Sequence, residues 1–169
     1  MIWQLTLFAL MAAGLVHARL TTNGSKGRVA EMMLVYVLAG YCGVLMLGLG
    51  IVAVVNPDWI AINMAGVPPG NATMIWAGFL FIGLAIASIM TIWHRGAFLL
   101  APVIAWTTYW GGAVYAHIVA DQLRGHALTA QSFLDIFIGH GLTAAILVVL
   151  TAVWWQSSQA EPSVSALAQ

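Results

Sequence analysis

The chain has 169 residues, of which 62% are hydrophobic and only 6% are Asp, Glu, Lys or Arg, and its formal net charge is zero. A water-soluble domain would carry charge on about a quarter of its surface residues, so this composition excludes one. The sequence has no block of Lys and Arg, which also excludes an extended surface for nucleic acid. We therefore expect the lipid bilayer to be the solvent of this chain.

Five apolar stretches are each long enough to cross a bilayer, which takes about 20 mostly apolar residues. The first lacks the positively charged start of a secretory signal peptide, and basic residues follow it, so we interpret it as a retained helix. The predicted fold class is all-α: an integral membrane bundle of five transmembrane helices in a single domain, 1–155, followed by a flexible cytoplasmic tail, 156–169. The expected spans are 2–20, 32–55, 73–93, 96–120 and 132–155.

The distribution of Lys and Arg between the loops predicts an orientation. Arg19, Lys26 and Arg28 follow the first span, Arg95 follows the third, and Arg124 alone follows the fourth. Loops rich in Lys and Arg stay in the cytoplasm, so the first and third loops are expected to be cytoplasmic. The N-terminus is then outside and the C-terminus is cytoplasmic.

The loops and spans contain several local signals. In the second loop, turn residues flank 59–64, which we expect to form a short interfacial helix. The third loop is short enough to make a tight helical hairpin, and Pro102 is expected in the first turns of the fourth span or at a kink. Cys42 lies inside an apolar stretch and is interpreted as a packing residue. Glycines that let helix backbones approach closely in lipid are Gly40, Gly43, Gly48, Gly50, Gly111 and Gly112.

Polar residues gather near the outer ends of the last two spans. His117 and Asp121 are four residues apart and therefore share one face of the fourth span. At about 1.5 Å per residue, His117 and Asp135 lie at similar depths, whereas His140 of the fifth span lies about one helical turn deeper. A pair of His117 and Asp135 across the hairpin is therefore feasible. The glycines on either side of His140 are expected to leave open space around its imidazole.

Three interpretations of these four residues remain open. His117, Asp121, Asp135 and His140 can form a structural hydrogen bond or ion pair that joins the two helices. They can instead form a proton relay or a ligand site, because histidine titrates near neutral pH. The third interpretation is ligation of a tetrapyrrole pigment or haem by His117 or His140. The spacing of the four residues matches no standard metal site.

The tetrapyrrole interpretation rests on a short pattern. Ala113-x-x-x-His117 resembles the pigment-binding pattern of bacterial antenna helices. Ligation of one haem by both histidines is disfavoured, because their expected depths differ by about a helical turn. The mid-membrane Trp106 and Trp110 are four residues apart and share a face, which favours packing over a substrate cage.

From Glu31 to about His140, the chain resembles a family of small bacterial multipass inner-membrane proteins of unknown function. The shared anchors are Glu31, Asn56-Pro57-Asp58, Gly96-Ala97-Phe98, His117-Ile118 and Asp135-Ile136. The resemblance implies the same helical fold, a location in the bacterial inner membrane, and importance for His117 and Asp135. Where the family often has a proline after Asp-Ile, this chain has Gly139-His140, which makes His140 a special feature of this chain.

The sequence contains no recognised catalytic motif, so an enzyme is not the expected function. Short loops and glycine-lined spans favour an accessory or scaffolding subunit of a larger inner-membrane complex, with other membrane proteins as partners. The alternatives are a small transporter or ligand-binding bundle that uses the His/Asp cluster, and a subunit that binds pigment or haem.

Overall fold

The structure is a computed structural model that describes residues 2–21, 25–65, 68–70, 72–123 and 129–160. Every regular element in these residues is a helix. The segments η1, η2 and η4 are π-helical, with wider turns than an α-helix, and η3 is a 3-10 helix. In chain order the elements are α1 Ile2–Thr21, α2 Lys26–Tyr36, η1 Val37–Leu45, α3 Met46–Val55, α4 Pro57–Ile60, η2 Ala61–Ala65, α5 Thr73–Met90, η3 Gly96–Leu99, α6 Leu100–Leu123, α7 Ala130–Ile136, η4 Phe137–Gly141 and α8 Leu142–Ala160.

The predicted all-α fold with five spans is confirmed. Five described helices are long and apolar enough to cross a membrane: Ile2–Thr21, Lys26–Val55, Thr73–Met90, Gly96–Val119 and Phe133–Gln159. The second of them is continuous through α2, η1 and α3, and the fifth is continuous through α7, η4 and α8. The chain is therefore an integral multipass membrane protein.

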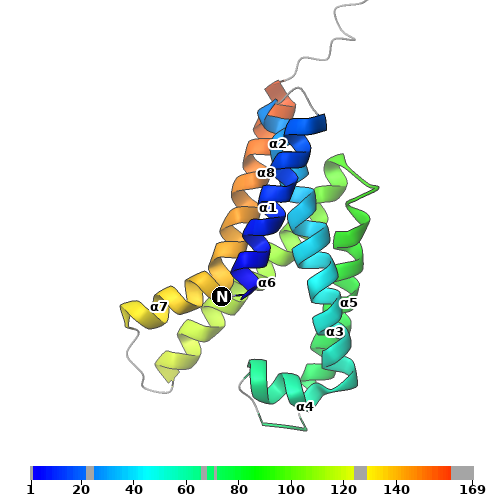
Figure 1. Cartoon of the computed structure of the whole chain (residues 1–169). Coiled ribbons are helices and arrows are strands. Elements are labelled where there is room, and N and C mark those ends of the chain that lie inside the picture. The colour runs from blue at the N-terminus through cyan, green and yellow to red at the C-terminus, as the bar shows by residue number, and fades with distance from the viewer. Residues whose placement is uncertain (1, 22–24, 66–67, 71, 124–128, 161–169) are drawn as a thin grey trace, which may run out of the picture. The chain divides into compact units, whose positions relative to one another are not determined.

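Contacts group the helices into two compact units, 1–36 with 103–169 and 37–102. In the first unit, α2 packs against both α1 and α8, and these three helices run side by side in Figure 1. The contact of α1 with α2 needs a glycine. A Cβ added at Gly14 would stand 2.8 Å from Cα of Met33, so only glycine allows these backbones to approach so closely.

In the second unit, α3 and α5 form the main contact, and η1 also packs on α5. Two glycines face each other across the first contact. A Cβ on either Gly50 or Gly78 would stand 2.9 Å from the carbonyl oxygen of the other. A Cβ at Gly43 would stand 2.7 Å from Cγ1 of Ile89 on α5. The prediction that glycines support close packing is thus confirmed for Gly43 and Gly50. In contrast, a Cβ at Gly48, Gly111 or Gly112 would meet nothing within 4 Å in the described residues.

The second loop folds back on itself. The side chain of Asn56 accepts a hydrogen bond from the backbone N–H of Trp59 at 3.3 Å, and Pro57 occupies the first turn of α4. The carboxylate of Asp58 accepts a hydrogen bond from the N–H of Gly70 at 2.6 Å. The short helix predicted over 59–64 is found as the end of α4 followed by η2.

The observed helix ends differ slightly from the predicted ones. α5 ends at Met90, and the chain turns into η3 through Gly96, whose φ of +66° favours glycine. Pro102 lies in the first turn of α6, where it disrupts no internal helix bond. α8 continues to Ala160, past the start of the segment expected as a tail, and residues 161–169 lie outside the described part.

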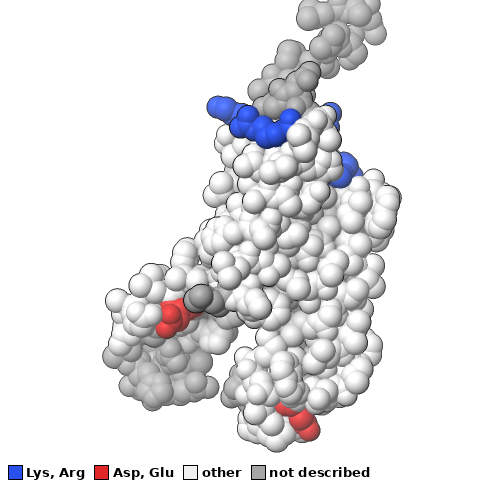
Figure 2. All heavy atoms as spheres, in the orientation of Figure 1, with Lys and Arg blue, Asp and Glu red and all other residues white. Residues whose placement is uncertain are grey.

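Charge is unevenly distributed over the first unit. Its described Lys and Arg residues are Arg19, Lys26 and Arg28, at the end of α1 and the start of α2. Figure 2 shows this positive end in blue, with the carboxylate of α7 in red at the other end of the unit. Arg28 makes an ion pair with Glu31 at 3.6 Å.

Candidate functional site

A stripe of aromatic side chains runs along one face of α6. Trp106, Trp110 and His117 are separated by four and seven residues, which are the spacings of one helical face. The two indoles stack with ring centroids 6.1 Å apart and planes inclined by 25°. Trp106 is fully buried and Trp110 is 6% exposed, whereas His117 is exposed. The stripe therefore runs from buried to exposed positions along α6.

His140 from η4 inserts its imidazole into the gap between Trp110 and His117. Its ring lies 5.5 Å from the indole of Trp110, with planes inclined by 21°, and 5.0 Å from the imidazole of His117, with planes inclined by 10°. Trp110 and His117 are seven residues apart, which is a rise of about 10.5 Å along the helix. The distances from the ring of His140 to these two rings add up to about the same value. The four rings thus form one continuous aromatic stack.

The insertion of His140 coincides with a π-helical turn. η4 covers Phe137–Gly141, and extra turns of this kind are often found where a helix presents a functional side chain. A Cβ at Gly141 would stand 2.6 Å from the ring of Phe137, so a larger residue there would have to displace that ring. A Cβ at Gly139 would meet nothing within 4 Å, whereas the imidazole of His140 itself contacts the rings of Trp110 and His117.

Several polar atoms around the stack are buried without a hydrogen-bond partner. Among the described residues these include Nε1 of Trp110, Nδ1 of His140 and Oε1 of Gln4. Gln4 belongs to the same neighbourhood, because its amide nitrogen donates a hydrogen bond of 3.3 Å to the carbonyl of Ile138, two residues before His140. A buried polar atom that lacks a partner costs about 1–3 kcal/mol. Native structures leave few such atoms unmet, and a water, an ion or another bound molecule can satisfy them.

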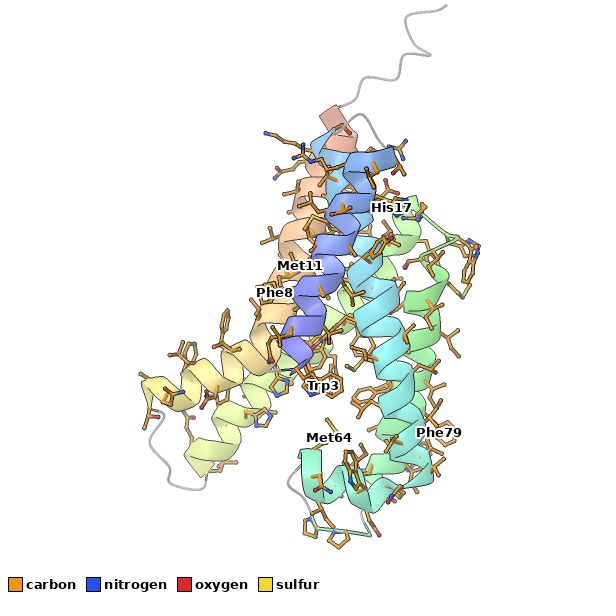
Figure 3. The ribbon with its side chains drawn as sticks, viewed as in Figure 1. Trp3, Phe8, Met11, His17, Met64 and Phe79 are labelled. Carbon is orange, nitrogen blue, oxygen red and sulfur yellow. The ribbon has the colours of Figure 1, made fainter. Side chains whose placement is uncertain are left out.

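The site lies at one end of the first unit. Figure 3 shows Trp3, the neighbour of Gln4, and His17 at opposite ends of α1. His17 is at the positive end, where its Nδ1 and the hydroxyl of Tyr36 form a hydrogen bond of 2.9 Å. The aromatic stack is therefore at the end remote from the described cations of this unit.

The structure brings together two of the four residues singled out in the sequence. His117 and His140 contact each other through stacked rings whose centroids are 5.0 Å apart. This distance is close to the rise of one helical turn, which is the difference in depth expected from the sequence. The pair of His117 with Asp135 that their depths made feasible is not among the described contacts: the Asp135 carboxylate accepts a hydrogen bond of 3.0 Å from Nε2 of Gln131, one turn earlier on α7. Asp121 is placed on α6, but its side chain lies outside what the structure describes.

The arrangement also limits the metal chemistry available. An imidazole binds a metal through a nitrogen lone pair in the plane of its ring, at about 2.0 Å. Two rings stacked face to face cannot both direct their lone pairs at one haem iron between them. Single ligation, by either His117 or His140, is compatible with this geometry. No group of three or more His, Cys, Asp or Glu able to hold a metal ion occurs in the described residues.

Sequence reasoning missed Gln4 and gave Trp110 a packing role only. Gln4 is a polar residue within an otherwise apolar span, which is the signal that could have found it. The seven-residue gap between Trp110 and His117 was a second signal, because it leaves room on one face for a ring from a neighbouring helix.

Comparison with known proteins adds no further constraint. No protein-family model, no curated protein and no solved structure matches this chain. The resemblance to a family of small bacterial membrane proteins therefore stays a prediction, and function has to be argued from the site.

Proposed function

We propose that this protein is a membrane-embedded binding protein whose site is the aromatic stack of Trp106, Trp110, His140 and His117. The observation that carries the proposal is the pair of buried nitrogens on adjacent stacked rings, Nε1 of Trp110 and Nδ1 of His140, that have no partner in the described chain. A bound molecule that fills these hydrogen bonds recovers the cost of burying them. In this proposal Asp121 and Asp135 lie beyond the binding groups, near the same end of the two helices.

The proposal includes the orientation and the membrane. With the Lys- and Arg-rich loops in the cytoplasm, the stack lies in the outer leaflet of a bacterial inner membrane. A ligand would then reach the site from the lipid or from the outer side. The same group of residues is suited to the bundle acting as a small transporter, if the site also opens to the cytoplasm.

A second candidate function is that of an accessory or scaffolding subunit in a larger membrane complex. The observation that favours it is the exposed position of Gly111 and Gly112 on α6, where an added Cβ would meet nothing within 4 Å. A helix of another subunit could approach the backbone closely at such a place. The two functions are compatible, because a subunit of a complex can also carry the ligand.

A third candidate is a pigment- or haem-binding subunit. In this candidate His117 or His140 is a single axial ligand, because an imidazole ligates through the edge of its ring and two stacked rings cannot both face one iron. The open glycine positions on α6 would accommodate part of a flat macrocycle. This candidate predicts a strong visible or near-infrared absorption band in the purified protein.

Purification from native membranes tests these candidates together. The wild type and the variants His140→Leu and His94→Leu would be isolated in mild detergent, and their extracts analysed by mass spectrometry and absorption spectroscopy. His94 is exposed in the second unit and provides a matched control. We expect a small molecule at about one per chain in the wild type and in His94→Leu, and its loss from His140→Leu. Equal content in all three proteins contradicts the proposed site. A stoichiometric protein partner without a small molecule favours the scaffold.

A further inference from the structure

We infer that the ligand of the aromatic stack is a lipid-soluble quinone, a neutral planar compound with carbonyl oxygens at the edge of its ring. The inference rests on the proposed function and names the chemical class of its ligand. Four properties of the site carry it: the hydrogen-bond donors, the lack of Lys and Arg among the described residues nearby, the parallel rings, and the apolar surroundings.

The buried nitrogens require an acceptor. Nε1 of Trp110 is only a donor, and Nδ1 of His140 is a donor in the tautomer that carries its proton there. Carbonyl oxygen is the neutral acceptor that satisfies both types of N–H. The unpartnered Oε1 of Gln4 is only an acceptor, so it would take a hydrogen bond from a hydroxyl. The site therefore provides donors for the carbonyls of a quinone and an acceptor for the hydroxyl of the reduced form, the quinol.

The ligand should carry no net charge. In the first unit the described Lys and Arg residues are all at the opposite end, at the junction of α1 and α2. Among the described residues, no Lys or Arg of this unit lies at the stack to balance an anion, and an uncompensated charge within the membrane is costly. The carboxylate of Asp135 is exposed and already hydrogen-bonded to Gln131. A neutral ligand avoids both problems.

The ligand should be flat and should arrive through the lipid. The planes of the stacked rings differ by 10° to 25°, so a flat ligand can lie parallel to them beside the stack, with its edge toward the nitrogens of Trp110 and His140. The residues beside the stack expose apolar surface to the membrane: Tyr115 is 70% exposed, Ile138 47% and Phe137 38%. A ligand with a hydrocarbon tail would keep that tail in lipid while its ring enters the site.

The test uses the full-length protein in lipid nanodiscs and decylubiquinone as the probe. The eight indole N–H signals of ¹⁵N-tryptophan-labelled protein would be recorded by NMR, with Trp110 assigned from Trp110→Phe. We expect decylubiquinone to shift the Trp110 signal saturably. In His140→Phe, which keeps an aromatic ring but loses the nitrogens, binding should weaken about three- to tenfold, as loss of one hydrogen bond implies. In the matched control His94→Phe it should be unchanged.

A second probe keeps the inference falsifiable if His140→Phe does not fold. Decylbenzene has the same tail and a planar ring but no carbonyl, so it should leave the Trp110 signal of the wild type in place. An unmoved signal with decylubiquinone, or equal shifts with the two probes, overturns the quinone assignment. If native purification still yields a different small molecule that His140→Leu loses, the proposed binding function stands and only the ligand class is wrong. If no such molecule is found either, both fall.

Discussion

The contact between α3 and α5 gives the sharpest prediction about how the second unit is held together. Replacing Gly78 with alanine adds a Cβ that would stand 2.9 Å from the carbonyl oxygen of Gly50 and 2.8 Å from Cγ2 of Val54. A carbonyl belongs to the backbone and cannot swing away, so the helices must separate. Gly83 lies five residues further on the same helix, and a Cβ there would meet nothing within 4 Å.

The expected magnitude follows from the difference between these two positions. Both Gly→Ala changes gain up to about 1 kcal/mol of helix propensity. Only Gly78→Ala also loses stability through overpacking, which destabilises a protein by about 1–3 kcal/mol. Gly78→Ala should therefore be less stable than Gly83→Ala by about 1–3 kcal/mol, or roughly 5- to 150-fold in the unfolding equilibrium constant.

The assay is reversible unfolding by SDS in mixed micelles, followed by the loss of helical circular dichroism. Gly50→Ala should behave like Gly78→Ala, because its Cβ would stand 2.9 Å from the carbonyl oxygen of Gly78. If Gly78→Ala and Gly83→Ala unfold with the same free energy, the two glycines do not hold α3 and α5 in backbone contact, and this account of the second unit is refuted.

Three further predictions concern other parts of the chain. Tyr36→Phe removes the hydrogen bond to His17 and should lower the free energy of unfolding by about 1 kcal/mol in the same assay, whereas Tyr115→Phe at an exposed position should leave it unchanged. Asn56→Ala removes the side chain that caps α4 and should raise the amide hydrogen-exchange rate of Trp59 about fivefold or more, while an unaltered rate would mean that the cap contributes nothing. In a Cys42→Ala background, an impermeant maleimide should label Asn63→Cys from outside intact cells and Ser25→Cys only after permeabilisation; the reverse pattern would invert the proposed orientation.

Composition and hydropathy were enough to predict the helical fold. Five long apolar stretches in a chain with so little charge leave few alternatives, because every backbone polar group in lipid must be satisfied within a helix. The π-helical turns could not be predicted in the same way. They depend on how individual side chains such as Phe137 pack against a particular glycine, and hydropathy does not record that.

The candidate site was predicted in part. Both histidines were singled out because titratable groups inside apolar spans are rare. Their partners were not predicted correctly, because the levels of two residues on neighbouring helices do not determine which way their side chains point. Asp135 turns to Gln131 on its own helix, and His140 reaches the gap between Trp110 and His117 from a turn whose geometry is not that of an α-helix.

The most direct test of the central claim is an electron cryomicroscopy structure of the protein extracted in native lipid, with a bound antibody fragment to aid alignment. The proposal predicts non-protein density within hydrogen-bonding distance of both Nε1 of Trp110 and Nδ1 of His140, continuous with a tail in the lipid. A stack whose two nitrogens contact only protein atoms or a single water would contradict it.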